Sequence, residues 1–448
     1  MFRYANRRNP ILPLDIHTPD CEAHVFSDGK LHVYGSLDKY NGTWCSEEHI
    51  AVSTPDMKTW EISGVCFSSE RIPWRNDPIP ECFERETDRQ GSPFVRRMNR
   101  KSEQTAVISK AGIPDDSMTK NQPFLYAPDC IEKDGKYYML FDLSSGAEGI
   151  AVSDSPDGPF RDPVQLPCKG IDPAAFIDTD GQAYYYWGQF RLHGAKMNDS
   201  MTGFVPDSIA DNLVTEEEHF FHEGSSMRRI GNTYYLVYTS IERGKANCLS
   251  YATSSSPLGP FIYRGVIIDN QGCDPQTWNN HGSIECFNGQ WYVFYHRSSR
   301  NSKFWRRLCI EKIRIREDGT IPEVPMTSQG IGGPFGSGEK IMGYQACALK
   351  GGCYIDEDSA HGEKLTGIRN GDSAVFRFVR STEPWKTIEL EAAGKGKVQV
   401  FMNGTRAGTL DLTGGKSTGW LDMPAGEYEL ELCFEAPEGM EIYSLTLY

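Results

Sequence analysis

Three acidic side chains, each inside a short motif, are the residues of this chain best suited to chemistry. Asp20 lies in HTPDCEAHVF, Asp129 in YAPDCIEKDGKYYMLF and Glu223 in FHEGSSM. Hydrolysis of a glycosidic bond needs one carboxylic acid to protonate the departing oxygen and a second carboxylate opposite it. A third carboxylate can keep the acid protonated by repelling its charged form. If the fold brings the three side chains together, they predict a site that cleaves glycosides.

Each of these carboxylates also has an ordinary structural explanation. An Asp after Pro, as in TPD and APD, is more often a turn residue than a catalyst. Glu223 precedes Gly224, which is equally typical of a turn. The catalytic interpretation therefore depends on elements that hold the three side chains at matching positions.

A hairpin phrase that returns five times along the chain supplies such positions. Its copies are SDGKLHVYGS, KDGKYYMLFD, TDGQAYYYWG, IGNTYYLVYT and FNGQWYVFYHR, each with a tight turn between β-forming residues. Recurrence at roughly 50 residues is typical of propeller blades. The companion phrases IAVSTPDMKTW, IAVSDSPDGPF and LSYATSSSPLGPF predict outer strands of the same blades. We therefore expect five blades, and a β-sandwich with repeated hairpins is the alternative.

Two further segments divide the chain. Residues 71–121 are polar and lack clear periodicity, so we expect a long inserted loop that either walls the substrate cleft or lies away from it. Gly, Ser and Pro concentrate in residues 324–338, which predicts a linker. The runs that follow, AVFRFV, TIELEA, VQVFMNG and YELELCF, alternate apolar and polar residues as in a β-sandwich. The expected fold class is all-β, with a five-bladed β-propeller catalytic domain in residues 1–323 and a jelly-roll sandwich in residues 339–448.

The composition and net charge of the chain limit the kinds of molecule that it is expected to bind. The 448 residues include 12% aromatic residues, 44 Gly and 26 Pro, which favours many short strands. A net charge of -15 opposes binding to nucleic acid or to a membrane and suits a neutral oligosaccharide. The 13 Cys form no CxxC pair, and neither a signal peptide nor an apolar run of about 18 residues is evident. We therefore expect a cytoplasmic protein that takes short imported sugars, and the sequence leaves its oligomeric state open.

The three acidic motifs, in this order, resemble glycoside hydrolase family 43, the five-bladed propeller enzymes that include α-L-arabinofuranosidases, β-xylosidases and endo-arabinanases. The opening RNPILPLDIHTPDCEAHVF is similar to the start of that family and implies that Asp20 is the general base. The Ala-Pro-Asp block implies that Asp129 tunes the pKa of the acid, and the Glu-Gly block that Glu223 is the acid. The resemblance covers about the first 320 residues. It implies an exo-acting, inverting hydrolase that releases α-L-arabinofuranose or β-D-xylose from short plant-cell-wall oligosaccharides and requires no cofactor.

Alternatives remain within and outside this class. The base motif reads Pro-Asp-Cys-Glu where many members of the family have Asp-Pro, so an exchange of roles between Asp20 and Glu22 on one strand face stays open. An arabinanase or a galactosidase of the same family is an alternative activity, because the loops between strands set the substrate. A non-catalytic, sugar-binding propeller is the alternative from a different functional class.

Four further residues are expected to contact the sugar. The last-blade block NHGSIECFNGQWYVFYHR implies that His281 faces the propeller axis, where it touches substrate, water or a structural calcium ion, although calcium prefers oxygen ligands. Arg297 is expected to donate to a sugar hydroxyl, with a structural ion pair as the alternative. Trp187 is expected to stack on a sugar face, with burial as the alternative. His24, on the Asp20 strand, is expected to reach the axis.

The C-terminal runs GIRNGDSAVFRFV, KVQVFMNGTRAGTLDL and MPAGEYELELCF resemble a family 6 carbohydrate-binding module. The usual sugar-stacking aromatic residue after Gly-Asp is replaced by Ser373. Trp385 and Trp420 are the remaining candidates for glycan contact. The alternative is a domain that has lost or moved its site and packs against the propeller.

Overall fold

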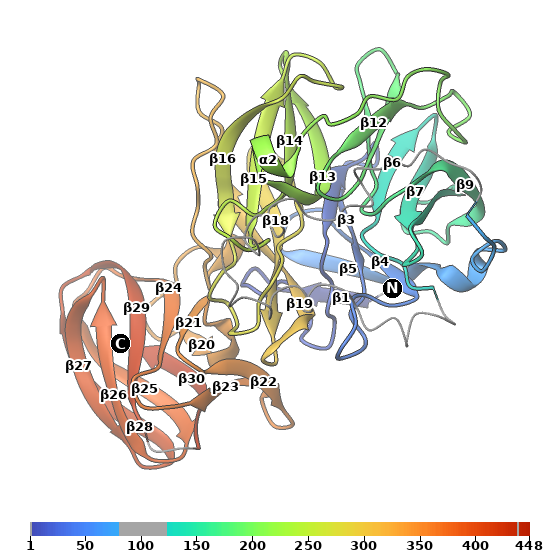
Figure 1. Ribbon diagram of the computed structural model, residues 1–448. Coiled ribbons are helices and arrows are strands. Elements are labelled where there is room, and N and C mark those ends of the chain that lie inside the picture. The colour runs from blue at the N-terminus through green and yellow to red at the C-terminus, as the bar shows by residue number, and fades with distance from the viewer. Residues whose placement is uncertain (1, 80–122, 437–438) are drawn as a thin grey trace, which may run out of the picture.

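A computed structural model describes residues 2–79, 123–436 and 439–448, and it confirms an all-β fold (Figure 1). Five antiparallel sheets follow one another along the chain and form the blades of a propeller. Their strands are β1 (Phe2–Ala5), β2 (Glu22–Val25), β3 (Leu31–Ser36), β4 (Glu48–Thr54) and β5 (Thr59–Ser68); β6 (Asp129–Lys133), β7 (Lys136–Asp142), β8 (Ala147–Ser153) and β9 (Arg161–Lys169); β10 (Ala174–Ile177), β11 (Ala183–Trp187) and β12 (His193–Lys196); β13 (Phe221–Ile230), β14 (Thr233–Ser240), β15 (Cys248–Ser254) and β16 (Ile262–Asp269); β17 (Ser283–Phe287), β18 (Gln290–Ser299) and β19 (Ser302–Ile313). Each recurring phrase forms the first hairpin of a blade, as its turn chemistry predicts.

The first strands of the five blades close a ring around one axis. In this ring β2 contacts β6, β6 contacts β10, β10 contacts β13, β13 contacts β17, and β17 returns to β2. A parallel bridge between Cys21 and Gly282 also joins the first blade to the last. Residues that are far apart in sequence but lie just ahead of a first strand therefore meet at one end of the axis.

The second strand of each blade is rich in aromatic residues because both of its faces are covered by neighbouring blades. In β11, Tyr185 packs towards Leu140 of the preceding blade, whereas Tyr184 and Tyr186 pack towards Leu236 of the following one. Alternate residues of a strand point to opposite faces. Burial on both faces therefore replaces the apolar–polar alternation of a half-exposed strand with a continuous apolar run.

The C-terminal region is one antiparallel sheet that folds around its own core. Its order is β21-β24-β29-β26-β27-β28-β25-β30-β23-β22, and β20 pairs with β30. The strands are β20 (Lys340–Met342), β21 (Ala348–Lys350), β22 (Tyr354–Asp358), β23 (Gly362–Ile368), β24 (Ser373–Ser381), β25 (Trp385–Ala393), β26 (Gly396–Met402), β27 (Thr405–Leu412), β28 (Gly415–Met423), β29 (Gly426–Glu435) and β30 (Met440–Leu447). This arrangement confirms a β-sandwich after the propeller, and its core includes the buried Trp385.

The segment 324–338, expected to be a linker, is packed rather than loose. Ile331 and Phe335 are buried, and the Thr327 N–H donates to the Glu311 carboxylate of β19. Its short 3-10 helix is Gly330–Gly332, and the other short helices are Ser69–Arg71, α2 (Glu216–His219) and Gly343–Gln345. No helix in the described ranges is long and apolar enough to cross a membrane. Most of the expected inserted loop, residues 71–121, lies outside the described residues.

Candidate active site

Three carboxylates lie at equivalent positions of three blades. Asp20, Asp172 and Glu223 each stand seven residues ahead of a recurring phrase, which starts at Ser27, Thr179 and Ile230 respectively. Because the first strands of the blades surround one axis, these residues come together at one of its ends.

Asp20 is held as an ion pair. Its backbone has a positive φ of 58°, and its side chain is buried just ahead of β2. Arg306 Nη1 of β19 donates to Asp20 Oδ1 at 2.9 Å, and the same guanidinium donates to both oxygens of Asp38. Burial by itself would raise the pKa of Asp20, but the charge of Arg306 outweighs it, so the pKa is lowered. Asp20 is therefore ionised at neutral pH.

Glu223 is displaced from the regular ladder of β13 by local irregularity. The β13–β14 pairing shifts register on both sides of Glu223, as in a β-bulge, which re-aims a side chain. Gly224, with a φ of +60°, makes room for the His281 ring, because a Cβ on Gly224 would lie 2.6 Å from His281 Nε2. Gln189, just after β11, donates from Nε2 to Glu223 Oε2 at 2.8 Å. The second oxygen of Glu223 is thus left for another partner.

Asp172 and His281 complete the group. His281 Nδ1 lies 3.8 Å from Asp172 Oδ2 and 3.9 Å from Asp20 Oδ1. The Asp172 N–H donates to Asp142 Oδ1 behind it. Burial, then repulsion from Glu223, Asp142 and Asp20, raises the pKa of Asp172 well above its usual range. Burial lowers the pKa of His281, so this imidazole is neutral at neutral pH.

The site therefore contains carboxylates in opposite protonation states. Asp20 stays charged beside Arg306, while Asp172 retains a proton because its burial, and then the neighbouring Glu223, oppose its ionisation. Paired carboxylates whose environments separate their pKa values are the usual arrangement of a general base and a general acid.

The structure places Asp129 in a different cluster from Asp20 and Glu223. Asp129 Oδ1 lies 2.7 Å from His24 Nε2, and Asp129 Oδ2 accepts the Ala175 N–H. Glu22 accepts from Arg228 Nη2 at 2.7 Å in the same cluster. Asp129 stands only four residues ahead of its phrase, which starts at Lys133, so it occupies a different position in its blade from Asp20, Asp172 and Glu223. The geometry thus favours Asp172 over Asp129 as the third carboxylate.

Glu22 and His24 belong to the same cluster as Asp129. Burial raises the pKa of Glu22 to about 7, against the opposing charge of Arg228. His24, expected to contact sugar, lines a cavity of about 280 Å³ together with Arg228 and Phe26. Because Glu22 contacts these residues rather than the Asp172–Glu223 group, the geometry does not favour exchanging its role with that of Asp20.

A calcium ion needs several free oxygen ligands. Among the described residues, Glu22, His24 and Asp129 form the group whose ligand atoms lie within 4.8 Å of one another. The Glu22 oxygen already accepts from Arg228 and from Ser226, and both Asp129 oxygens are engaged. This group therefore does not fit calcium. Calcium at His281 stays a prediction.

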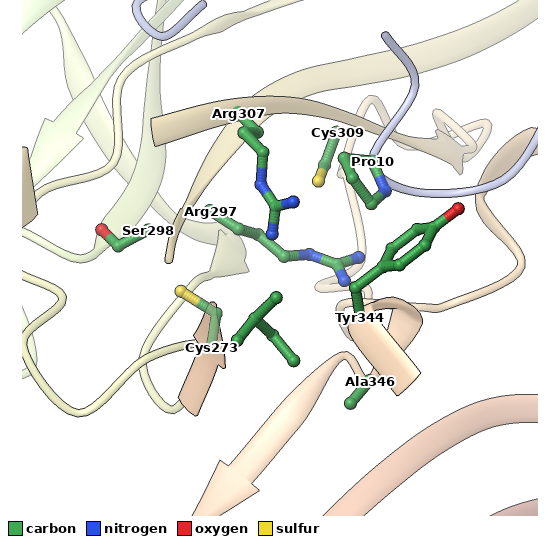
Figure 2. Close-up of a pocket in the computed structure, with 9 residues that line it drawn as sticks. Pro10, Cys273, Arg297, Ser298, Arg307, Cys309, Tyr344 and Ala346 are labelled. Atoms are coloured by element: carbon green, nitrogen blue, oxygen red, sulfur yellow. The ribbon is translucent and has the colours of Figure 1, made fainter. Parts of the chain in front are cut away.

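Two residues expected to contact sugar are buried in the packing. Trp187 is fully buried and stacks on Phe204 at a centroid distance of 5.3 Å, so its face is not available to a sugar. Arg297 pairs with Glu311 at 3.4 Å and donates to the Tyr295 hydroxyl. Figure 2 shows Arg297 beside Arg307 and Tyr344, around a space of about 10 Å³, which holds one water at most. For both residues the structural alternative is the correct one.

Sequence reasoning missed Asp172, Arg306 and Gln189. The first had a signal in the sequence, since the offset of seven residues that Asp20 and Glu223 share also selects Asp172 and excludes Asp129. Arg306 and Gln189 had none, because their roles arise from contacts between blades.

Comparison with known proteins identifies the family of this chain. Residues 103–321 match the model of Glycosyl hydrolases family 43. Xylosidase/arabinosidase of Thermoclostridium stercorarium is 31% identical over 411 residues, which cover 81% of this chain and 75% of that protein. The chain belongs to glycosyl hydrolase family 43. It is therefore a glycoside hydrolase built on a propeller.

Solved structures of this hydrolase family share the fold. A β-xylosidase/α-arabinofuranosidase from a compost microbial metagenome, solved with xylotriose in a calcium-free form, is 27% identical with a TM-score of 0.52; the match covers 72% of this chain and 99% of that chain. An arabinoxylan arabinofuranohydrolase of Bacillus subtilis, solved with cellotetraose, is 21% identical with a TM-score of 0.53; the match covers 98% of this chain and 97% of that chain. The second likeness shows that propeller and sandwich together form a known fold.

Proposed function

We propose that this hydrolase releases terminal α-L-arabinofuranose or β-D-xylose from short plant-cell-wall oligosaccharides with inversion at the anomeric carbon. The observation that carries the proposal is the meeting of an ionised Asp20 with Glu223 and with Asp172, whose pKa is raised, at one end of the axis. The xylosidase/arabinosidase and the xylotriose complex among its relatives support a pentose substrate.

Each carboxylate takes a role that its surroundings suit. Asp20, kept charged by Arg306, accepts a proton from the water that attacks the anomeric carbon. Glu223 gives a proton to the departing glycosidic oxygen, so the bond to the leaving group breaks as the bond to water forms. Burial of Asp172 and its repulsion with Glu223 keep a proton on this pair of carboxylates, and Glu223 is the member that delivers it. No organic cofactor enters this sequence of proton transfers.

Gln189 directs the proton of Glu223. Its amide donates to Glu223 Oε2, which leaves Oε1 as the oxygen that can carry a proton to the substrate. A proton carried by Oε1 can be transferred without first turning the carboxyl group. Gln189 is thus a positioning residue rather than a proton donor.

The experiment compares the protein with Glu223→Gln and Asp20→Asn on nitrophenyl α-L-arabinofuranoside and β-D-xylopyranoside. We expect each variant to lose most turnover while its circular dichroism spectrum stays unchanged. The anomer first released from a natural oligosaccharide, followed by NMR, should be inverted. A retained anomer would refute the single displacement. Sugar binding without any hydrolysis would instead favour the non-catalytic propeller.

The state of the cysteines bears on the cellular compartment of the protein. All described cysteines are free, ten of them buried, as expected of a protein in a reducing environment. We propose a cytoplasmic location, to be tested by activity in fractionated cells of the source organism.

A further inference from the structure

Two adjacent arginines of β19 join the active site to the sandwich. Arg306 and Arg307 are both buried. Because successive residues of a strand point to opposite faces, their guanidinium groups reach different partners. Arg306 pairs with Asp20 at 2.9 Å, whereas Arg307 Nη1 donates to Glu363 Oε2 of β23 in the sandwich. One strand therefore connects the proposed general base with the second domain.

The Arg307–Glu363 pair is shielded from solvent where the two domains meet. The Arg307 side chain is 6% exposed and the Glu363 side chain is 1% exposed. Figure 1 shows β22 and β23 at the edge of the sandwich that faces β19. Arg307 of the propeller and Tyr344 of the sandwich both line the space of about 10 Å³. Charges buried in this way interact strongly, because little solvent screens them.

Stability alone does not account for this pair. Arg307 Nε and Glu363 Oε1 are buried and have no hydrogen-bond partner in the protein. Burial raises the pKa of Glu363 against the opposing charge of Arg307. Replacing a buried ion pair by apolar residues is often neutral or stabilising, whereas removing one partner is strongly destabilising. The pair is therefore better suited to fixing how the two domains meet than to adding stability.

The sandwich also holds the turn that precedes β19. The Arg300 N–H donates to the Ile355 carbonyl of β22 at 2.6 Å, and Arg300 Nη2 pairs with Glu357 at 2.6 Å. Along the chain, Arg306 lies between this attachment and the one at the next residue of β19. The hydrogen bond from Arg306 to Asp20 weakens steeply when its donor is misaligned. A change in the position of β19 therefore reaches Asp20 through Arg306.

The other ionisable groups near Arg307 do not replace Glu363. Burial keeps three of them uncharged at neutral pH, with the pKa at about 2 for His17, about 12 for Tyr344 and about 11 for Cys309. Burial raises the pKa of Asp274 to about 6, and its two oxygens already accept backbone N–H groups. Glu363 is thus the carboxylate that balances the charge of Arg307.

We propose that Arg307 and Glu363 are positioning residues of the active site, through which the sandwich holds β19 so that Arg306 meets Asp20. Both residues act through Arg306 and take no direct part in proton transfer. The sandwich is then a structural part of the catalytic unit rather than an attachment to it. The inference rests on the proposed role of Asp20 as the general base.

The test is kcat/KM against pH for Glu363→Gln, which removes the charge and keeps the shape of the side chain. The substrate is the nitrophenyl glycoside that the parent protein hydrolyses fastest. We expect the acid limb to move to higher pH and kcat to fall, by as much as about 10²-fold if β19 displaces catalytic groups by about 1 Å. Glu357→Gln is the matched control, because Glu357 pairs with Arg300 at the same contact but is 66% exposed. Its acid limb should lie at the pH of the parent protein.

Arg307→Met combined with Glu363→Leu keeps the inference testable if Glu363→Gln does not fold. This double variant leaves no unpaired charge, so we expect a melting temperature close to that of the parent protein and an acid limb that is still shifted. An acid limb at the parent's pH, in a folded Glu363→Gln or in the double variant, would overturn the inference. An equal shift in Glu357→Gln would overturn it as well.

Asp20→Asn in the same assay separates this inference from the proposed function. Full activity of Asp20→Asn would refute the general base. An inactive Asp20→Asn beside an unmoved acid limb in Glu363→Gln would refute only the positioning role. An inactive Asp20→Asn beside a shifted limb supports both.

Discussion

Replacement of Arg306 by Gln tests whether Asp20 is kept ionised by its ion pair. Arg306 Nη1 lies 2.9 Å from Asp20 Oδ1, and both side chains are at least 95% buried. Unit charges about 4 Å apart attract by about 4 kcal/mol at an effective dielectric constant of about 20. Because water entering the vacated space restores only part of this stabilisation, we expect Arg306→Gln to raise the pKa of Asp20.

The sign of the effect on activity follows from the role of Asp20. A general base acts in its deprotonated form, so the acid limb of kcat/KM against pH reports its pKa. Arg306→Gln should therefore move this limb to higher pH, with a large loss of activity at pH 5 and a smaller one at pH 8. The assay is initial-rate hydrolysis of a nitrophenyl pentoside from pH 4 to pH 9.

Arg297→Gln provides the matched control. Arg297 is also a buried arginine of the last blade, and it pairs with Glu311 rather than with a catalytic group. Breaking a buried ion pair from one side costs about 3–5 kcal/mol, so both variants should lose stability in urea unfolding. Only Arg306→Gln should shift the acid limb. If the acid limb of kcat/KM lay at the same pH in both variants, the role given to the Arg306–Asp20 pair would be refuted.

Three further predictions concern two other carboxylates and the amide that contacts Glu223. Asp172→Asn should lower kcat by about 10²–10⁴, the usual contribution of general acid catalysis. Asp129→Asn, if it folds, should lower kcat far less. If steady-state kinetics give the reverse order, Asp129 is the third carboxylate. Gln189→Ala should lower kcat more than it changes KM for a pentoside, and an effect on KM alone would contradict its positioning of Glu223. Burial raises the pKa of Glu148 to about 8, so the folded state holds a proton that the unfolded chain releases, and stability falls as pH rises from about 4.5 to about 8. Glu148→Gln should flatten this fall in the melting temperature, and an unchanged pH dependence would refute it.

Much of the fold was predictable because its signals are local. A tight turn with flanking β-forming residues identifies a hairpin wherever it occurs, and repetition of that hairpin identifies the propeller. Gly135, for example, adopts a φ of +74° in the turn of the second phrase, which glycine does without strain. The alternating runs after residue 339 predicted the sandwich for the same reason.

The segment 324–338 shows where such local signals end. Its Gly, Ser and Pro content is typical of a flexible linker, yet Thr327 donates to the buried Glu311 and Phe335 enters the sandwich core. Composition describes what a segment can do by itself. Whether it packs depends on the surfaces that two domains present to it.

The residue type likewise did not decide which side chains are exposed to solvent. Trp187 and Trp420 both had a sugar contact among their possible roles, and the structure buries the first between two blades while leaving the second in water. Arg297 follows the same logic, since its guanidinium turns to Glu311 on a neighbouring strand rather than to the axis.

The sequence by itself determined the number of blades, the sandwich, and Asp20 and Glu223 as candidate acids, because repeats and motifs are properties of nearby residues. Only the tertiary structure showed that His281 lies between Asp172 and Asp20 and that Arg306 holds Asp20 charged. The offset of Asp172 from its turn is visible in the sequence, but an ion pair across 286 positions of chain has no local signature. Both depend on how the closed ring of blades brings distant side chains into contact.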